Sequence, residues 1–155
     1  MKKKQPIYEY WRKLQNLPFG KTIYSILINL YVPYTGSIGS RVEVLEPGFA
    51  QIRLKQRRSV QNHLNSIHAL AIANLAELAG NLALFAGMPG DARLIVKGFD
   101  IRYLKKARGV IRASAKTPIL ESNKEIDLEI LVEIMNSDHE LVATCTIYTL
   151  VGPVK

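Results

Sequence analysis

The stretch from Ala69 to Gly90 constrains the fold of this 155-residue chain most, because it is long and apolar and carries one charged side chain, Glu77. Alanine, leucine and isoleucine surround this glutamate on every side of a helical wheel. A helix that is apolar nearly all round is buried rather than amphipathic. A carboxylate inside such a helix costs free energy unless it is paired, protonated or used. We therefore interpret residues 62–85 as the entrance and body of a buried central helix, with Glu77 at the centre of the chemistry.

A membrane span is the alternative for this stretch, since about 20 apolar residues cross a bilayer. Asn74, Glu77 and Asn81 interrupt it, and it contains more alanine than leucine. Ionisable groups are rare at the depth where Glu77 would lie. We expect no membrane span. We also expect no signal peptide, because no uninterrupted apolar segment follows the basic N-terminus.

Two helices are predicted before the central stretch, at 5–16 and 22–31, where apolar residues recur every three or four positions. They could pack on the rest of the chain or lie on a membrane surface. Packing is the favoured interpretation, and peripheral membrane contact stays open. We assign residues 1–33 to an N-terminal helical segment and residues 34–155 to the main domain, within a single structural domain.

Six strand-like runs flank the central helix, and most alternate apolar with polar residues, as in a sheet that is solvated on one face. Two form a hairpin over 41–55, and four follow the helix at 93–103, 109–115, 126–134 and 141–151. The simplest fold is α+β, an antiparallel sheet of about six strands wrapped around one long central helix. The open edges of such a sheet favour pairing with a second copy, in a homodimer or a dimer of dimers.

This order of elements, with Asn62, His68-Ala69 and Glu77 at their spacing, resembles the hotdog-fold thioesterases. The likeness is greatest to an uncharacterised branch of the phenylacetate-pathway-like group, and it covers residues 31–150. The runs that carry it are Pro33-Tyr-Thr-Gly-Ser-Ile38, Asn62-His63, His68-Ala69, Asn74-Leu-Ala-Glu77 and Tyr103-Leu-Lys-Lys-Ala-Arg-Gly109.

The resemblance implies roles for Asn62, His68, Ala69 and Glu77. Asn62 would position substrate or water, and Glu77 would be the catalytic carboxylate, as general base or nucleophile. Ala69, directly after His68, would take the place of the first glycine of the family's His-Gly-Gly motif. This chain departs from that motif at Ala69 and Leu70, where two glycines are usual. The family builds its site across a dimer, with the carboxylate of one chain facing the loop of the other.

Elementary chemistry also favours this region for thioester hydrolysis. The first N–H groups of a helix have no internal partner and favour negative charge, so the Ala69 N–H is a candidate oxyanion donor. Burial should raise the pKa of Glu77, which suits a general base near neutral pH. Its small or polar neighbours would leave room for substrate and offer hydrogen bonds, and these are Asn74, Gly80 and Asn81. A second stripe should serve packing alone, and it comprises Ala71, Leu75, Leu78 and Leu82.

Each of these residues also has a structural interpretation. Glu77 could be a buried acid that is bonded to a neighbouring asparagine or to a partner chain, and Asn62 could cap the turn into the helix. His68 could orient its neighbours, and Ser66 is the predicted N-cap of the helix. His63 and His68 are five residues apart, which does not place them on one helix face as metal-binding pairs are, so no metal is expected.

The net charge of +8 favours anionic partners. Lys105, Lys106 and Arg108 follow a predicted strand, and Arg58 lies in the loop into the helix. These residues could bind the phosphates of coenzyme A, as part of the substrate rather than as a cofactor, or could form a basic solvated surface. Nucleic acid is disfavoured, because no binding motif is present. The lone Cys145 excludes an internal disulfide and favours a reducing, cytoplasmic location.

Three functions therefore compete. The leading interpretation is an acyl-CoA thioesterase. The second is a protein that binds acyl or aryl thioesters without hydrolysing them, which the missing glycine pair favours. The third, a hotdog dehydratase, ranks lower because the proline-rich loop that usually lies beside the histidine is absent.

Overall fold

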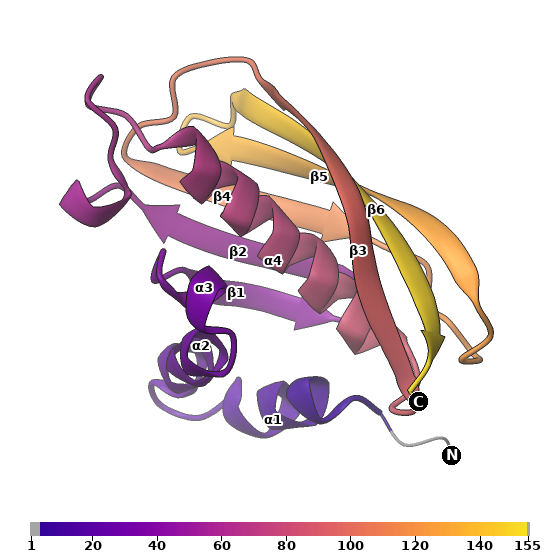
Figure 1. Ribbon diagram of the computed structural model, residues 1–155. Coiled ribbons are helices and arrows are strands. Elements are labelled where there is room, and N and C mark those ends of the chain that lie inside the picture. Colours follow the sequence, from indigo (N-terminus) through magenta and orange to yellow (C-terminus); the bar gives the residue numbers. More distant parts are fainter. Residues whose placement is uncertain (1–3, 155) are drawn as a thin grey trace.

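The central helix, α4 (Ala69–Gly87), lies in the concave face of a curved sheet, as the computed structural model shows in Figure 1. The structure describes residues 4–154. Between Ala71 and Gly87, 13 residues of this helix are buried. The helix packs mainly on β2 (Phe49–Lys55) and β4 (Val110–Lys116). The predicted core helix is thus confirmed, and its apolar composition follows from its burial on most sides.

All six predicted strands are present, in one antiparallel sheet of order β1-β2-β4-β5-β6-β3. The remaining strands are β1 (Arg41–Glu46), β3 (Ala92–Tyr103), β5 (Ile126–Asn136) and β6 (Leu141–Pro153). The hairpin of β1 and β2 turns at Gly48, whose φ of +79° is a left-handed conformation that suits glycine. Both edges of the sheet are strands of this chain, β1 on one side and the 12-residue β3 on the other.

Small side chains on the sheet let the helix approach closely. Ala113 pairs with Ile52, and Ala115 pairs with Ala50, all four buried on the face below α4. Gly80 meets the sheet from the helix side, because a Cβ placed there would lie 2.5 Å from the Cδ1 of Ile147 on β6. Side-chain volume is thus removed on both sides of the helix–sheet interface, as dense core packing requires.

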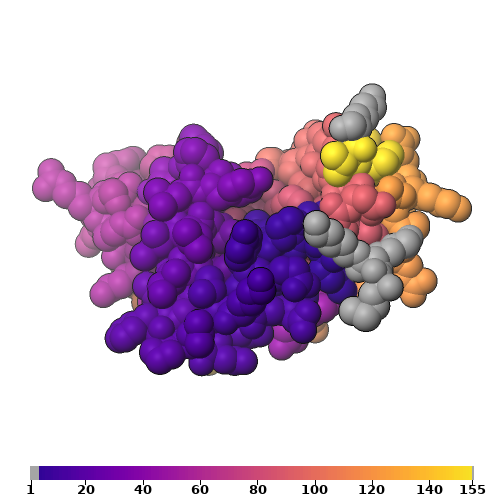
Figure 2. Space-filling view, turned by 90° about the horizontal axis from the view of Figure 1, so that it is seen from below, coloured from indigo at the N-terminus to yellow at the C-terminus, as the bar shows by residue number. Residues whose placement is uncertain are grey.

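The N-terminal helices α1 (Pro6–Leu14) and α2 (Gly20–Tyr31) pack on each other, and specific side-chain bonds attach α2 to the sheet. Ser25 on α2 accepts a hydrogen bond from the N–H of Val42 (2.9 Å), and Lys21 donates to the carbonyl of Glu43 (2.8 Å). Trp11 on α1 and Tyr24 on α2 are both buried and meet edge to face, with ring centroids 5.0 Å apart. Figure 2 shows that this N-terminal segment covers much of the face seen from below, with later parts of the chain at one side.

The structure departs from the sequence prediction in two short segments. Residues 34–40, predicted as a loop, begin inside a helical turn, α3 (Pro33–Gly36), and a 3-10 turn, η1 (Arg58–Val60), lies in the polar segment before α4. Pro33 stands in the first turn of α3, where its missing N–H costs nothing. Of the predicted segment 1–33, residues 1–3 lie outside the part that the structure describes.

By length and hydropathy alone, α4 could cross a membrane. In the fold, 67% of its most apolar window is buried against other parts of the chain, as in the core helix of a folded domain. The outer face of α2 is a different case. It exposes several large apolar side chains, Phe19, Ile23, Ile26, Leu30 and Tyr31 among them. Peripheral membrane contact by this face stays a prediction.

Candidate active site

One stripe of α4 escapes full burial. Between Ala71 and Gly87, the residues that are not buried are Ala73, Glu77, Asn81 and Phe85, each four positions after the last. Residues four apart lie above one another on a helix, so these side chains form one row along its length. Glu77 and Asn81 are the polar members of that row. The sequence predicted both as site residues, and the structure places them side by side.

Three members of the row, Glu77, Asn81 and Phe85, line a cavity of about 880 Å³ between α4, the N-terminal helices and the start of β3. Glu77 is the one charged residue among those that line it. Most of the other lining side chains are aliphatic or aromatic, and they include Ile7, Leu27, Ile28, Leu82, Phe85 and Leu94. The cavity therefore presents a single carboxylate to an apolar enclosure, within the size range of ligand-binding pockets.

The cavity changes the acid–base chemistry of Glu77. Burial raises the pKa of its carboxyl group, because an apolar surrounding disfavours the charged form, and a hydrogen bond from the Asn81 side chain opposes this rise in part. The Oδ1 of Asn81 is buried and has no hydrogen-bond partner in the described part of the chain. Glu77 thus holds its proton more firmly than an exposed glutamate, and Asn81 has an acceptor atom that remains unpaired.

The start of α4 lies in a second, smaller hollow of about 250 Å³, which is lined by His68, Leu70 and Asn74 among others. His68 is the N-cap, and its Nδ1 accepts a hydrogen bond from the N–H of Leu70 (3.1 Å). The Ala69 N–H has no acceptor among residues 4–154, whereas its carbonyl accepts a bond from Tyr103 (2.9 Å). An unpaired N–H at a helix start is available to bind an anion or an oxyanion.

The predicted N-cap, Ser66, is wrong, because the chain uses Ser66 to close the loop before the helix. The Oδ1 of Asn62 accepts hydrogen bonds from the hydroxyl of Ser66 (3.1 Å) and its N–H (3.2 Å), and from the N–H of Leu64 (3.0 Å). Asn62 therefore shapes this loop, which is the structural interpretation of that residue. The loop leaves His68 as the first residue that can cap α4.

Asn74 belongs to the hollow at the helix start rather than to the Glu77 cavity. Its Nδ2 donates to the carbonyl of Tyr34 (3.3 Å), and its Oδ1 is buried without a partner among the described residues. Gly80 faces the sheet and Ile147, so its missing side chain makes room for packing and not for a ligand. Leu78 and Leu82, predicted as packing residues alone, also line the cavity.

The basic residues predicted near the site differ in their contacts. Arg108 donates from Nε to the carbonyl of Asn65 (3.1 Å), and the neighbouring Ala107 carbonyl accepts from Ile67, so this loop is joined to the loop that leads into α4. Lys105 instead pairs with Glu140 (2.6 Å), and this contact lowers the pKa of Glu140. Lys106 and Arg58 are exposed.

The structure separates the helix start from Glu77. Ala69 and Glu77 are eight residues apart, which is about 12 Å along a helix axis. Their surroundings also differ, since the neighbours of Ala69, His68 and Leu70, line the smaller hollow, whereas Glu77 lines the larger cavity. One thioester carbonyl cannot contact both groups of the same chain. Asn62, His68 and Ala69 therefore form one cluster, and Glu77 and Asn81 form another.

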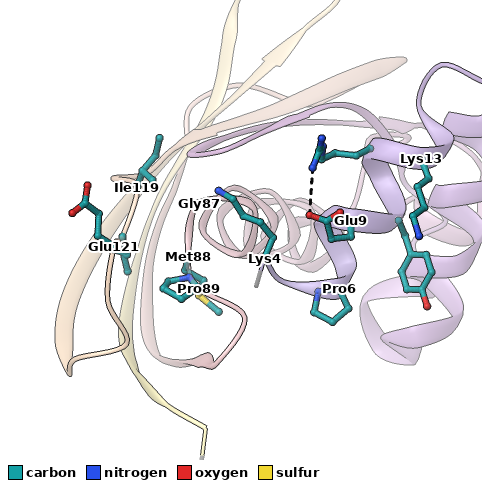
Figure 3. Close-up of a pocket in the computed structure, with 12 residues that line it drawn as sticks. Lys4, Pro6, Glu9, Lys13, Gly87, Met88, Pro89, Ile119 and Glu121 are labelled. Atoms are coloured by element: carbon teal, nitrogen blue, oxygen red, sulfur yellow. Dashed lines mark ion pairs between the residues drawn. The ribbon is translucent and has the colours of Figure 1, made fainter. Parts of the chain in front are cut away.

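A third hollow of about 880 Å³ lies between α1 and the connection from β4 to β5 (Figure 3). Lys4, Lys13 and the ion pair of Arg12 with Glu9 (3.5 Å) stand at its side. It adjoins the Glu77 cavity at Pro6 and Tyr10, which line both. No group of three or more metal-binding side chains occurs within residues 4–154.

Comparison with known proteins shows what this arrangement is similar to. The family described as "domain of unknown function (DUF4442)" matches residues 20–151. The structural-genomics protein APC5556 is 29% identical, with a TM-score of 0.82 over 96% of this chain and 99% of that one. PA5026 from Pseudomonas aeruginosa, a protein of unknown function and probable thioesterase, is 25% identical, with a TM-score of 0.77 over 89% and 97%.

The thioesterase HI1161 from Haemophilus influenzae shares the fold at 14% identity, with a TM-score of 0.70 over 81% of this chain and 88% of that one. No curated protein matches the chain. The similar structures and the sheet wrapped around α4 confirm the hotdog-type α+β fold expected from the sequence.

The raised pKa of Glu77 predicts how stability depends on pH. Since the folded protein binds this proton more tightly than the unfolded chain, the stability of the fold should fall as pH rises from the ordinary glutamate pKa through the raised one. Glu77→Gln removes this titration. The variant should melt at a higher temperature than wild type at about pH 8, and the difference should shrink toward about pH 4.

The exposed Glu129 on β5 supplies the control, because Glu129→Gln should shift the melting temperature equally little at both pH values. If Glu77→Gln melts below wild type at the higher pH, the carboxylate is a paired structural acid instead.

Proposed function

The chain belongs to the DUF4442 family, and we propose that it hydrolyses acyl-CoA or a related thioester at Glu77. One observation carries the proposal, namely a carboxylate of raised pKa that is the one charged group in a mostly apolar cavity. Perturbed carboxyl groups in clefts are typical of general bases. The thioesterase names of similar structures support the same reaction class.

The reaction needs a base and an oxyanion donor. In the proposed step, the Glu77 carboxylate takes a proton from water, and the water oxygen attacks the thioester carbon. An N–H donor stabilises the oxyanion, the carbon–sulfur bond breaks, and the departing thiolate takes up the proton. A direct attack by Glu77 on the same carbon, followed by hydrolysis of the anhydride, uses the same cavity and stays an alternative.

We infer that two chains complete the site, because Glu77 and the Ala69 N–H of one chain lie too far apart to contact one carbonyl. In a homodimer, Glu77 of one protomer would face the Ala69 N–H and the Asn62 loop of its partner. The long edge strand β3 supports such pairing, since an unpaired strand edge tends to be covered or extended. A dimer of dimers is compatible with the same contact.

The phosphates of coenzyme A would bind the basic residues of the joined loops. Arg108 donates to the carbonyl of Asn65, in the loop that contains Asn62. Lys106 lies two residues before Arg108, Arg58 lies four residues before Asn62, and both are exposed. Lys105 is less suited, because it is already paired with Glu140. Coenzyme A enters as part of the substrate, and we propose no separate cofactor. A cytoplasmic location stays a prediction from composition.

A second candidate function is binding of acyl or aryl thioesters without turnover. Leu70 favours it, because a bulky and 65% exposed side chain stands where the active relatives have glycine. Binding to wild type with no hydrolysis, together with turnover gained by the Ala69→Gly, Leu70→Gly double variant, would favour this candidate. A dehydratase would instead hydrate an enoyl-CoA, which a separate assay detects.

Replacing the proposed base should abolish most turnover. We expect Glu77→Gln to lower kcat for acyl-CoA hydrolysis by about 10²–10⁴-fold, the usual contribution of a general base. Glu129→Gln serves as the matched control and should keep wild-type activity. Thiol release over a panel of acyl-CoAs is the measurement, and full activity in Glu77→Gln would exclude Glu77 as the catalytic group.

Ala69→Pro tests the oxyanion donor while leaving the helix intact. Proline removes the N–H and is favoured at the first position of a helix, and His68 already has the extended ψ of 140° that a residue before proline adopts. We expect unchanged thermal stability and a kcat lowered by about 10²–10³-fold. Thermal stability is measured by circular dichroism and kcat by the same hydrolysis assay. Undiminished turnover would contradict a role for the Ala69 N–H as the oxyanion donor.

A further inference from the structure

We propose that the cavity beneath the N-terminal helices is an acyl chamber for straight aliphatic chains of about ten carbons, a substrate class that rests on the proposed function at Glu77. Its position carries the inference. The cavity starts at Glu77 and follows α4 past Asn81 and Leu82 to Phe85. An acyl chain bound there would have its carbonyl at the carboxylate and its tail directed toward Phe85.

The length of the chamber follows from the helix that forms its floor. From Glu77 to Phe85 is eight residues, or about 12 Å along the axis. A zigzag of carbon–carbon bonds of about 1.5 Å, with angles of about 111°, advances about 1.25 Å per bond. About ten carbons therefore span this floor.

The chemistry of the walls selects an aliphatic chain. Leu27 and Ile28 of α2 line the cavity together with Leu82 and Phe85 of α4 and Leu94 of β3. Beyond Glu77 and Asn81, the α4 floor offers no polar side chain. The other polar lining residues are uncharged, namely Gln5, Tyr10, Tyr24, Tyr31 and Thr35, and the Tyr24 hydroxyl already donates to the carbonyl of Ile7 (3.0 Å). A short acyl group would leave most of the apolar space unfilled, and an aromatic acyl group would fill only the part beside Glu77. Both would therefore bury less apolar wall surface than a straight aliphatic chain, and would gain less binding free energy.

The helix α2 offers a matched pair of variants. Leu27 lines the cavity and is 48% exposed, so a tryptophan there can enter the chamber without disrupting the core. Leu30 lies three residues further along the same helix, is 71% exposed, and does not line the cavity. Leu27→Trp therefore narrows the chamber, and Leu30→Trp makes the same chemical change outside it.

The experiment measures hydrolysis of acetyl-, hexanoyl-, decanoyl- and phenylacetyl-CoA by wild type and both variants. Each methylene that the walls bury should raise kcat/KM about fourfold, so decanoyl-CoA, with four more methylenes, should exceed hexanoyl-CoA by about 250-fold. Leu27→Trp should lower the value for decanoyl-CoA by about tenfold or more and leave that for acetyl-CoA within about twofold. Leu30→Trp should match wild type throughout.

Binding of decanoic acid, measured by calorimetry on the same three proteins, separates the two proposals. One outcome is that no thioester is hydrolysed, while decanoic acid binds wild type and Leu30→Trp but not Leu27→Trp. This outcome would support the acyl chamber and contradict the thioesterase proposal. Hydrolysis with no preference for decanoyl-CoA, or a preference that Leu27→Trp leaves unchanged, would contradict the acyl-chamber proposal and leave the thioesterase proposal intact. Equal decanoic acid binding by all three proteins likewise overturns the chamber.

Discussion

The close packing of α4 into the concave sheet is the contact on which the rest of this structure depends. It requires an apolar helix, small residues such as Ala113 and Ala115 on the sheet, and Gly80 where Ile147 approaches. Because the sheet curves around the helix, most of α4 loses contact with water. The side of the helix that the sheet does not cover is the row of Ala73, Glu77, Asn81 and Phe85.

That row determines where chemistry can occur. A carboxylate on the sheet side would need a buried partner, whereas on the row it faces a cavity that the N-terminal helices line on one side. Partial burial is enough to raise the pKa of Glu77, and the cavity leaves space for a substrate beside it. The helices α1 and α2 thus do more than cover an edge of the sheet, since their side chains form half of the enclosure around the proposed reactive group.

Periodicity in the sequence was sufficient to predict the central helix and the six strands. Helices and strands place apolar residues at a regular spacing, so the spacing alone indicates which side of each element is buried. The roles of Gly80 and Leu82 depend on what lies across the interface, which spacing on one helix does not reveal. Ser66 was a plausible cap by residue type, but the hydrogen bonds of Asn62 recruit it into the preceding loop.

Spacing along the sequence does not by itself separate the helix start from Glu77, although the resemblance to the hotdog-fold thioesterases implied a site built across two chains. Helix geometry supports that arrangement. Eight residues of rise separate Ala69 from Glu77, so the motif is consistent with one site only if the two groups come from different protomers. The proposed function therefore depends on a shared site more than on the identity of any one residue.

Mixed dimers test that claim most directly. Glu77→Gln and Ala69→Pro chains should each be nearly inactive alone. A dimer that contains one of each should have one intact site, with Glu77 from one protomer and the Ala69 N–H from the other. After equal amounts are unfolded together and refolded, random pairing should restore about a quarter of the wild-type specific activity. Activity that stays at the level of the separate variants would contradict a site shared between two chains.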